Sequence, residues 1–382
     1  MQKKALAAAI CCGAMLFAGT SAVPYMPAPA VCSAAAQLKT VTLGGKVLPV
    51  NAVVDKSVTE PKQDGSVWIC PTISSAIQKA HTLNAENPTV LVKPGTYDEK
   101  LRINIANLTL AGVTDPNYTI LEWHASRNDK VPEGDKTTTK TPGSVYGISD
   151  CATINVTKKA LNFQVVNMTL KNTYDPTQHP EEKHTDSPVM TISGDGSSFW
   201  NCRFEGHDTV INGKYGRQYY NGCYIEGGSD IVAGGASQVF ENCEVRSLMY
   251  RPKKTKGYIT KSATAASMRG ILFYKCDFTA DDQIPNCVYL GRPSHPSSAT
   301  EEIKCEVVFR ECNLGKHIKK DGWTKSTSNG VEFLPENERM FEYKNAGPGS
   351  SPERRQILDA DAANYTVSAF LYGWVPEVIE VK

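Results

Sequence analysis

Two aspartates, Asp208 and Asp230, follow cysteines at nearly the same distance in consecutive repeats of the sequence. Asp208 comes six residues after Cys202, and Asp230 comes seven residues after Cys223. If each repeat forms one coil of a solenoid, the two carboxylates stack on one face of neighbouring coils, where strands lie about 4.8 Å apart. Two carboxyl groups at such range differ in pKa, because the charge of one opposes the ionisation of the other. Such a pair can provide one neutral acid and one ionised nucleophile.

Short repeats built around cysteine must position these aspartates. The segments WNCRFEG, NGCYIEG, ENCEVRS, YKCDFTA and RECNLGK share a polar residue or glycine before the cysteine and a strand-forming residue two positions after it. The first three cysteines are 21 and 20 residues apart, and the next gaps of 33 and 36 fit one coil plus an inserted loop. A repeat of about 20 residues with short strands predicts an all-β, right-handed parallel β-helix, a single-stranded solenoid. The alternative, a flat antiparallel sandwich, does not account for the fixed position of the cysteines.

Short helices are expected to cap both ends of the solenoid, because terminal coils would otherwise expose unpaired edges. In the segment 71–83, apolar residues recur at helical spacing, which predicts a helix over the first coil: Ile73, Ala76, Ile77 and Ala80. The segment 357–371 opens with helix-favouring residues and finishes apolar, so we expect it to cover the other end. Polar loops are predicted at 174–186, 250–256 and 294–302.

The composition and the N-terminus bear on where the protein acts. The 382 residues carry a formal charge of +1, and without a long basic run we expect no nucleic-acid partner. Lys3 and Lys4 precede the uncharged apolar stretch Ala5–Val23, as in a secretory signal. We therefore assign residues 1–36 to a signal peptide with a linker and 37–382 to a single domain, in a protein that is secreted or periplasmic. Cleavage after Ala22 or around Ala34–Ala36 stays open, as does a retained membrane anchor; no later segment is long and apolar enough to span a membrane.

Cysteine usage predicts a buried stack. Three of the 12 cysteines fall in or near the signal, and nine remain, so at least one would be unpaired if the others formed bridges. Their recurrence at one repeat position predicts an interior column of small side chains. We expect no metal site, because no cysteine and histidine cluster has the spacing of zinc ligands.

Five motifs occur in an order known from one family: GTYDEK at 95–100, HDTV at 207–210, GGSDIVAG at 227–234, YLGRP at 289–293 and FEYKNAGPG at 341–349. Through them the chain resembles the pectin methylesterases, carbohydrate esterases of methylated galacturonan, from about Val67 to Trp374. The resemblance implies a secreted esterase that demethylates pectin and releases methanol. It implies no cofactor, no membrane in the mature form, and a monomer whose partner is the methyl ester of polygalacturonate.

The resemblance also implies roles for three residues. Asp230 would be the nucleophile, Asp208 the general acid and later the general base, and Arg292 the residue that keeps Asp230 ionised and oriented. An ionised carboxylate can attack an ester carbonyl, and a protonated one can deliver a proton to departing methanol. A guanidinium stays charged at any working pH and can bind a carboxylate through two hydrogen bonds.

The sequence departs from the family where glutamines stabilise the negative oxygen that forms on attack. His207 stands in place of the Gln before the acid/base aspartate, and the second Gln aligns with Asp186 or Ser187. Losing one such donor typically lowers the rate by roughly 10²–10³. His207 could donate from its ring and Ser187 from its hydroxyl, so we take both as candidate oxyanion or substrate contacts.

A further departure concerns the sugar platform. The Trp that often follows Arg-Pro in the family is Ser294 in this chain. Three tyrosines are candidate substitutes, although a core or turn position is as compatible with each: Tyr219, Tyr220 and Tyr250. In the early motif, Tyr97 and Glu99 are expected to be structural.

Because the sequence departs from the family at these positions, other functions stay open. A β-helix that binds pectin or uronate without turnover would keep the acidic pair, and an esterase for a different acyl substrate would explain the altered cleft. A polysaccharide lyase shares the architecture but generally uses calcium-binding acids, and no such acidic cluster stands out in the sequence.

Overall fold

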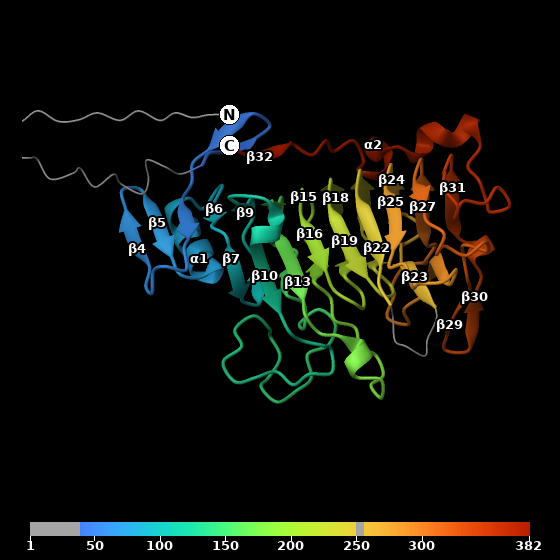
Figure 1. Cartoon of the computed structure of the whole chain (residues 1–382), viewed down its shortest axis with the longest axis horizontal. Coiled ribbons are helices and arrows are strands. Elements are labelled where there is room, and N and C mark those ends of the chain that lie inside the picture. Colours follow the sequence, from blue (N-terminus) through green and yellow to red (C-terminus); the bar gives the residue numbers. More distant parts are fainter. Residues whose placement is uncertain (1–38, 250–255) are drawn as a thin grey trace, which may run out of the picture.

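The computed structural model describes residues 39–249 and 256–382, and these wind into a parallel β-helix (Figure 1). The central coils each add one strand to each of three sheets, and within these sheets every described pairing is parallel apart from the one between β4 and β5. The expected fold class is confirmed. The assigned signal and linker, residues 1–36, lie outside the described residues.

We name the three sheets the long sheet, the cysteine sheet and the site sheet. The long sheet contains, in spatial order, β31 (Arg339–Tyr343), β27 (Glu306–Arg310), β24 (Ile271–Tyr274), β21 (Ser237–Glu241), β18 (Arg217–Asn221), β15 (Ser197–Trp200), β12 (Gln164–Val166), β9 (Thr109–Gly112), β6 (Thr89–Val92), β3 (Ala52–Val54), β5 (Val67–Cys70) and β4 (Lys62–Asp64). The cysteine sheet contains β28 (Asn313–Leu314), β25 (Asp277–Ala280), β22 (Glu244–Ser247), β19 (Tyr224–Gly227), β16 (Arg203–Glu205), β13 (Thr169–Asn172), β10 (Thr119–Trp123) and β7 (Gly95–Asp98). The site sheet contains β26 (Val288–Pro293), β23 (Gly257–Ser262), β20 (Val232–Gly234), β17 (Ile211–Gly213), β14 (Met190–Ile192), β11 (Ile154–Val156) and β8 (Leu101–Ile103).

The repeated cysteines form the predicted interior column. They lie at the corner between the long sheet and the cysteine sheet, all buried and all free thiols: Cys202, Cys223, Cys243, Cys276 and Cys312. The residue before each cysteine has a left-handed backbone, with φ between 48° and 60°. Glycine and asparagine adopt this conformation most readily, which explains why Asn201, Gly222 and Asn242 occupy it.

Aromatic rings form a second column inside the coils. Ring centroids of neighbours in the stack are 4.4–4.9 Å apart along Phe199, Tyr220, Phe240, Phe273 and Phe309. Each of these rings is fully buried. Identical registers in successive strands bring the same position of every coil together, so one side-chain type recurs along the axis.

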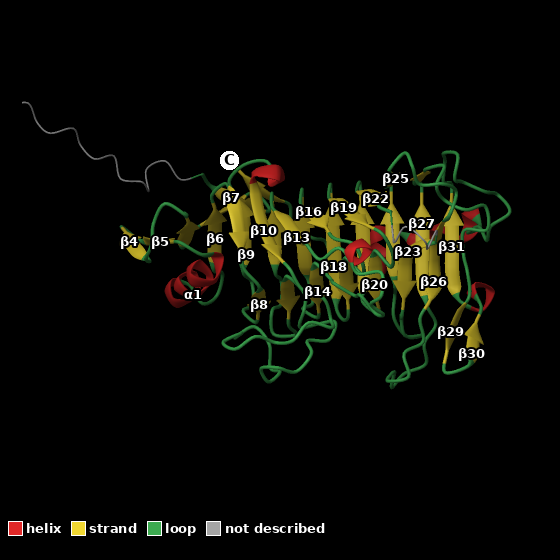
Figure 2. Ribbon diagram, turned by 60° about the horizontal axis from the view of Figure 1, so that its bottom comes forward, coloured by secondary structure: helices red, strands yellow, loops and turns green. Residues whose placement is uncertain are grey.

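A helix covers the first coil, as expected. Helix α1 (Ile73–Leu83) buries Ile73, Ala76, Ile77 and Ala80 and packs on β3, β5 and β6 (Figure 2). Its N-terminus is held by Glu99, whose carboxylate accepts hydrogen bonds from the backbone N–H groups of Ile73 and Ser74 at 2.7 and 2.9 Å. Buried Tyr97 donates its hydroxyl to the Lys93 carbonyl. Both residues of the early motif therefore have structural contacts, as predicted.

The C-terminal segment takes a different course from the expected cap. Its helical turns, η5 (Asp359–Tyr365) and α2 (Val367–Phe370), are present, but α2 packs against β21 and β24 on the outer flank of the long sheet. The chain then runs back along the solenoid to the N-terminal end, where β32 (Ile379–Val381) pairs with β1 (Val41–Leu43) (Figure 1). The apolar outer face of the long sheet selects this position, because Phe370 and Leu371 are buried there with Val239, Leu272 and Val308.

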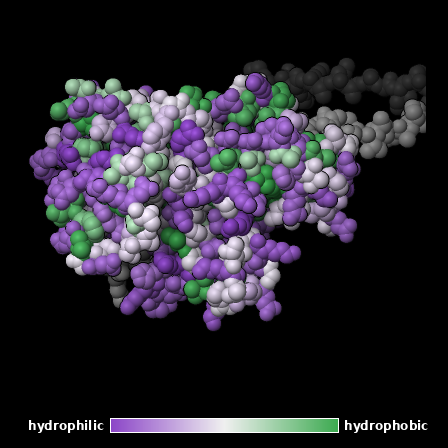
Figure 3. Space-filling view, turned by 180° about the vertical axis from the view of Figure 1, so that it is seen from behind, coloured by the Kyte–Doolittle hydropathy of each residue, from purple (hydrophilic) through white to green (hydrophobic). Residues whose placement is uncertain are grey.

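The remaining elements are short. They are β2 (Lys46–Leu48), the hairpin β29 (Ser326–Ser328) and β30 (Val331–Phe333), and the 3₁₀ turns η2 (Pro116–Tyr118), η3 (Pro176–Gln178) and η4 (Pro335–Asn337). In the part of the chain that the structure describes, no helix is both long and apolar enough to cross a bilayer. Hydrophilic residues dominate the face in Figure 3, with hydrophobic ones in small separate groups.

Candidate active site

Asp208 and Asp230 lie in neighbouring coils, just before β17 and β20 of the site sheet. They are not register partners, however: Asp208 forms a parallel bridge with Ser229. Since β17 and β20 keep a 21-residue offset, Asp230 corresponds to Thr209, one position beyond Asp208. The expectation of directly stacked carboxylates is thus wrong by one residue. Thr209 and Asp230 share a left-handed backbone, with φ of 57° and 48°, so the chain turns at the same place in both coils.

Arg292 holds the carboxylate of Asp230 with a two-pronged contact. Nε of Arg292 lies 3.1 Å from Oδ1 and Nη2 lies 2.6 Å from Oδ2. Arg292 reaches Asp230 from β26, which lies two strands beyond β20 in the site sheet. Burial alone would lower the pKa of Arg292, but the charge and hydrogen bonds of Asp230, together with Tyr258 and Asp208, raise it overall. The predicted pairing of Arg292 with Asp230 is present.

Two residues that we did not anticipate complete this environment. Lys261 on β23 places Nζ 3.4 Å from Oδ2 of Asp230. Tyr258, on the same strand, lies with its ring 4.5 Å from the guanidinium carbon of Arg292 and stacks on Tyr289. Burial raises the pKa of Tyr258, and Asp230 adds to the effect. Lys261 is the register partner of Arg292 in the neighbouring strand. This pairing could not be read from the sequence, because loops of unequal length separate the strands.

Asp208 is buried beside the same groups. The hydroxyl of Thr185 donates to Oδ2 of Asp208 at 3.2 Å, and Asp208 is close enough to Arg292 to raise its pKa. Two carboxyl groups in such different environments can take different roles: the buried one can transfer protons, and the arginine-bound one can act as the nucleophile.

The candidate oxyanion donors have described contacts with groups other than the Asp230 carboxylate. Nδ1 of His207 is 3.8 Å from the Asp175 carboxylate, and burial lowers the pKa of His207. Ser187 is fully buried, and its backbone N–H donates to the carbonyl of Asp208. The Asp186 carboxylate accepts a hydrogen bond from Arg127 at 2.9 Å. The roles of His207 and Ser187 therefore stay predictions, without a described contact to the nucleophile.

Of the three candidate aromatic substitutes, Tyr219 and Tyr220 take the alternative that we left open, a place in the packed interior or flank of the solenoid. Tyr220 lies in the core stack, and Tyr219 packs on the long sheet with its hydroxyl donated to Glu241. Both tyrosines lie on β18 of the long sheet, where Tyr220 faces the core and Tyr219 faces the outer flank. Neither therefore lies on the site sheet. Tyr250 lies outside the described residues. Tyr258 is instead the aromatic residue that contacts Arg292, and Tyr289 stacks on it.

A cleft of about 650 Å³ opens on the outward face of the site sheet. Residues from several coils and from the loop after β26 line it, including Thr209, Asn212, Ala233, Lys261, Ser294 and Glu301. Asn212, Ala233, Lys261 and Arg292 are successive register partners, so they form one row across the sheet. Since Lys261 both lines the cleft and pairs with Asp230, the cleft adjoins the two aspartates.

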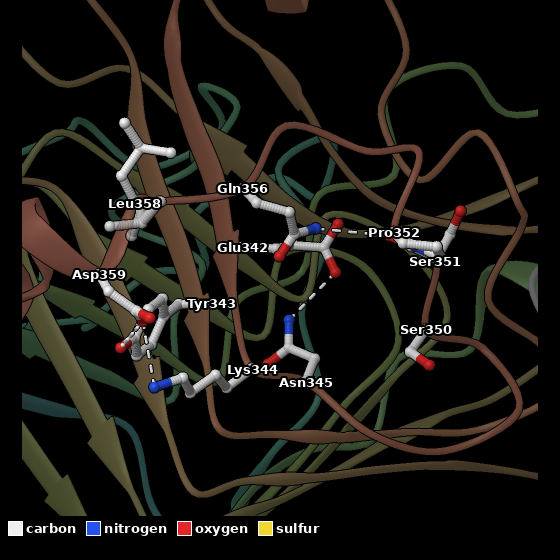
Figure 4. A pocket seen from close by; sticks show the side chains of 11 residues that line it. Glu342, Tyr343, Lys344, Asn345, Ser350, Ser351, Pro352, Gln356, Leu358 and Asp359 are labelled. Carbon is white, nitrogen blue, oxygen red and sulfur yellow. Dashed lines mark hydrogen bonds and ion pairs between the residues drawn. The ribbon is translucent and has the colours of Figure 1, made fainter.

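The late motif builds a separate cavity. Figure 4 shows Glu342, Asn345 and their neighbours around a space of about 500 Å³ at the C-terminal coils. The Glu342 carboxylate is bound by buried Arg354 and by the Asn345 amide. Asn345 also accepts the backbone N–H of Cys312. These bonds tie the last coil to the preceding one, so we assign the motif a structural role.

Three side chains of metal-ligand type lie together near the end of β26. Ligand atoms of His295, Cys305 and Glu338 lie within 4.8 Å of one another. Glu338 accepts hydrogen bonds from the His295 ring and the Cys305 backbone, and the thiol donates to the Ser262 carbonyl. Burial raises the pKa of Cys305 to about 12, so the thiol stays protonated. Each of the three groups therefore has a hydrogen-bond partner within the protein, and we assign no metal to them.

Known proteins share this architecture. A family model described as Pectinesterase matches residues 61–373. Pectinesterase A of Dickeya chrysanthemi is 30% identical over 357 residues, which cover 85% of this chain and 92% of that protein. Pectin methylesterase PemA from Erwinia chrysanthemi superposes with a TM-score of 0.73 at 28% identity, over 86% of this chain and 99% of that one. A pectin methylesterase in complex with a hexasaccharide superposes with a TM-score of 0.73 at 27% identity, over 87% and 99%. The chain therefore belongs to the pectinesterase family and is a carboxylic ester hydrolase.

Proposed function

We propose that the protein is an exported aspartyl esterase that hydrolyses the methyl esters of galacturonan in pectin and releases methanol. One observation carries the proposal: Arg292 holds the Asp230 carboxylate at the edge of an open cleft, with Asp208 buried in the adjacent coil. The relatives support the substrate class, since their names describe pectinesterases and one was solved with a hexasaccharide.

In the first half of the reaction, the ionised Asp230 attacks the carbonyl carbon of the methyl ester. The carbonyl oxygen takes up negative charge as the new C–O bond forms, and Asp208 in its neutral form donates its proton to the departing methoxide. Methanol leaves, and an anhydride joins Asp230 to the uronate. Arg292 keeps Asp230 ionised before attack, because a guanidinium does not lose its proton at working pH.

In the second half, Asp208 is ionised and acts as a general base. It takes a proton from a water molecule, and the hydroxide oxygen attacks the acyl carbon of the anhydride. The C–O bond to Asp230 breaks, which releases the uronic acid and restores both aspartates to their starting states; the uronic acid then loses its proton to the solvent. Every proton is returned, so the chain requires no co-reactant other than water.

Methanol release from methylated pectin tests the proposal. The wild-type protein is expected to release methanol, and Asp230→Asn is expected to remove this activity while the circular dichroism spectrum stays unchanged. Asp277→Asn is the matched control, because Asp277 is an exposed aspartate of β25 on the cysteine sheet.

Two results would contradict the proposal in different ways. A wild-type protein that releases no methanol across a broad pH range would overturn the substrate, and a parallel assay with an acetylated sugar and a small aryl ester would identify another acyl group. An Asp230→Asn variant with wild-type turnover would overturn the mechanism while leaving the substrate intact.

Export is the remaining part of the proposal. The lysines and the apolar stretch at residues 3–23 support it. Expression of the full chain in a bacterial host, followed by mass spectrometry of the periplasmic and medium fractions, should detect a mature N-terminus between residues 23 and 37. A protein found only in the cytoplasm with residue 1 intact would contradict export.

Light scattering of the mature form is expected to give the mass of a monomer.

A further inference from the structure

Lys261 occupies a place that the aspartyl mechanism described above does not use. Its ammonium lies 3.4 Å from Oδ2 of Asp230, the oxygen that Arg292 already contacts at 2.6 Å. The Lys261 side chain is 33% exposed and lines the cleft, whereas the Asp230 side chain is only 6% exposed. A substrate that reaches Asp230 from the cleft therefore meets Lys261 at the point of attack.

The charges around Asp230 leave one cation in excess. Arg292 supplies the counter-charge that Asp230 needs and binds both of its carboxylate oxygens. When Asp208 is protonated, as attack requires, Arg292 and Lys261 face the single negative charge of Asp230. A negative charge that develops on the substrate carbonyl oxygen would balance the excess, whereas the neutral ester in the ground state would not. Such selective stabilisation of developing charge is what accelerates a chemical step.

The position of Lys261 also suits the geometry of attack. The oxygen of a tetrahedral intermediate lies within about 3 Å of the attacking atom, and donors act on it at about 2.7–3.1 Å. An ammonium 3.4 Å from Oδ2 is within reach of that oxygen after a small rotation of its flexible side chain, and it carries three N–H donors. For His207 and Ser187, by contrast, the described contacts run to the Asp175 carboxylate and, through the backbone N–H, to the Asp208 carbonyl, and none runs to the Asp230 carboxylate.

We propose that Lys261 binds the oxyanion formed when Asp230 attacks the ester, in place of amide donors. The proposal rests on the proposed function, because it needs Asp230 as the nucleophile. Lys261 is then a catalytic residue in the strict sense, since it contacts the reacting carbonyl oxygen, and its charge acts on kcat more than on substrate binding.

Steady-state kinetics of methanol release from methylated pectin test the role. Lys261→Met, which keeps the apolar stem and removes the charge, is expected to lower kcat by roughly 10²–10³ with little change in KM. Lys261→Arg is expected to keep most of the activity, because it preserves a charged donor. Lys275→Met is the matched control, since Lys275 is an exposed lysine in the turn before β25. Thermal melting of each variant verifies that it is folded.

A lysine that only recognises a neighbouring uronate carboxylate would behave differently. Lys214 lines the same cleft, with Nζ at 3.1 Å from the Ser149 hydroxyl. Its Met variant is expected to raise KM at constant kcat. If Lys261→Met showed that pattern, or if it kept wild-type kcat while Asp230→Asn was inactive, the oxyanion role would be overturned and the aspartyl esterase would stand. If Asp230→Asn were itself active, the proposed mechanism would fail first, and Lys261 with it.

Discussion

Two residues of the turns at the aspartate pair adopt a backbone conformation that few residue types accept. Asp230 and Thr209 both have a left-handed backbone. Aspartate tolerates this region, but a β-branched threonine does not, and such strained positions cost of order 1–3 kcal/mol and cluster at functional sites. The turn directs the Asp230 carboxylate towards Arg292. We infer that the strained backbone is retained because it holds this carboxylate in one orientation.

Arg292→Lys tests how much the two-pronged contact contributes. The variant keeps the positive charge but loses the planar fork, so the Asp230 carboxylate is free to rotate. We expect kcat for methanol release to fall about 10²-fold with an unchanged fold, because small misplacements of a reacting group have effects of this size. Arg217→Lys is the control, since Arg217 forms the same fork with Asp195 at the start of β18. A kcat within threefold of wild type would contradict the positioning role of Arg292.

Among the elements, the long loop 124–153 was not anticipated from the sequence; it connects β10 to β11 of the site sheet and lies below β7, β10 and β13 in Figure 1. A buried ion pair joins it to the solenoid: Nζ of Lys100 lies 2.8 Å from the Asp135 carboxylate, which also accepts the Tyr146 hydroxyl at 2.6 Å. The same loop carries Arg127, which binds Asp186 in the coil that precedes the coil of Asp208. The loop is thus fixed by ion pairs to the solenoid and to the segment next to the two aspartates.

Asp135→Asn is predicted to loosen this loop in a pH-dependent way. Burial would raise the pKa of Asp135, but hydrogen bonds from Lys100, Thr137 and Tyr146 outweigh it and lower the pKa from 3.8 to about 2. Because the folded-state pKa is the lower one, the ionised carboxylate stabilises the fold above about pH 4, and this contribution is lost as the pH falls towards 2.

Urea unfolding measures that contribution. At pH 7, Asp135→Asn should lower the free energy of unfolding by about 3–5 kcal/mol, because it leaves the Lys100 ammonium buried without its partner. Between pH 4 and pH 2, the variant should lose less further stability than the wild type, since it has no carboxylate to protonate. Equal stability of variant and wild type at pH 7 would show that the ion pair does not brace the loop.

On the scale of the whole molecule, the coils are held together by the columns inside them. Phe240 lies in the middle of the aromatic stack, 4.4 Å from the Tyr220 centroid and 4.8 Å from that of Phe273. Each coil of a solenoid contacts only its neighbours, so removing a central ring weakens two interfaces at once. The outward face of the site sheet is not part of this column.

Phe240→Ala is therefore expected to destabilise the protein without disabling the site. The free energy of unfolding should fall by about 3–5 kcal/mol, because the lost ring leaves a cavity that the rigid coils fill poorly. The protein that remains folded should keep its kcat for methanol release. Tyr118→Ala serves as the control, since Tyr118 is an exposed ring and its loss should change stability by about 0.5 kcal/mol or less. If Phe240→Ala lowered the free energy of unfolding by less than about 1.5 kcal/mol, the aromatic stack would not be a main source of stability.

The sequence by itself determined the architecture, because its determinants are local and repeat. A cysteine at the same position of five repeats predicted the interior column, and apolar spacing from Ile73 to Ala80 located helix α1. The pairing of Arg292 with Asp230 was available only through the resemblance of two motifs to a family, since 62 residues separate them.

Only the tertiary structure decided which side chains meet at the site. The one-residue offset between Asp208 and Asp230 depends on the strand register, and the contact between Lys261 and Asp230 crosses a loop whose length breaks the repeat. The return of the C-terminus to β1 depends on an apolar flank assembled from several coils. These contacts arise from positions that share no local pattern, so their physical cause is the stacking of the coils and not the order of residues within any one of them.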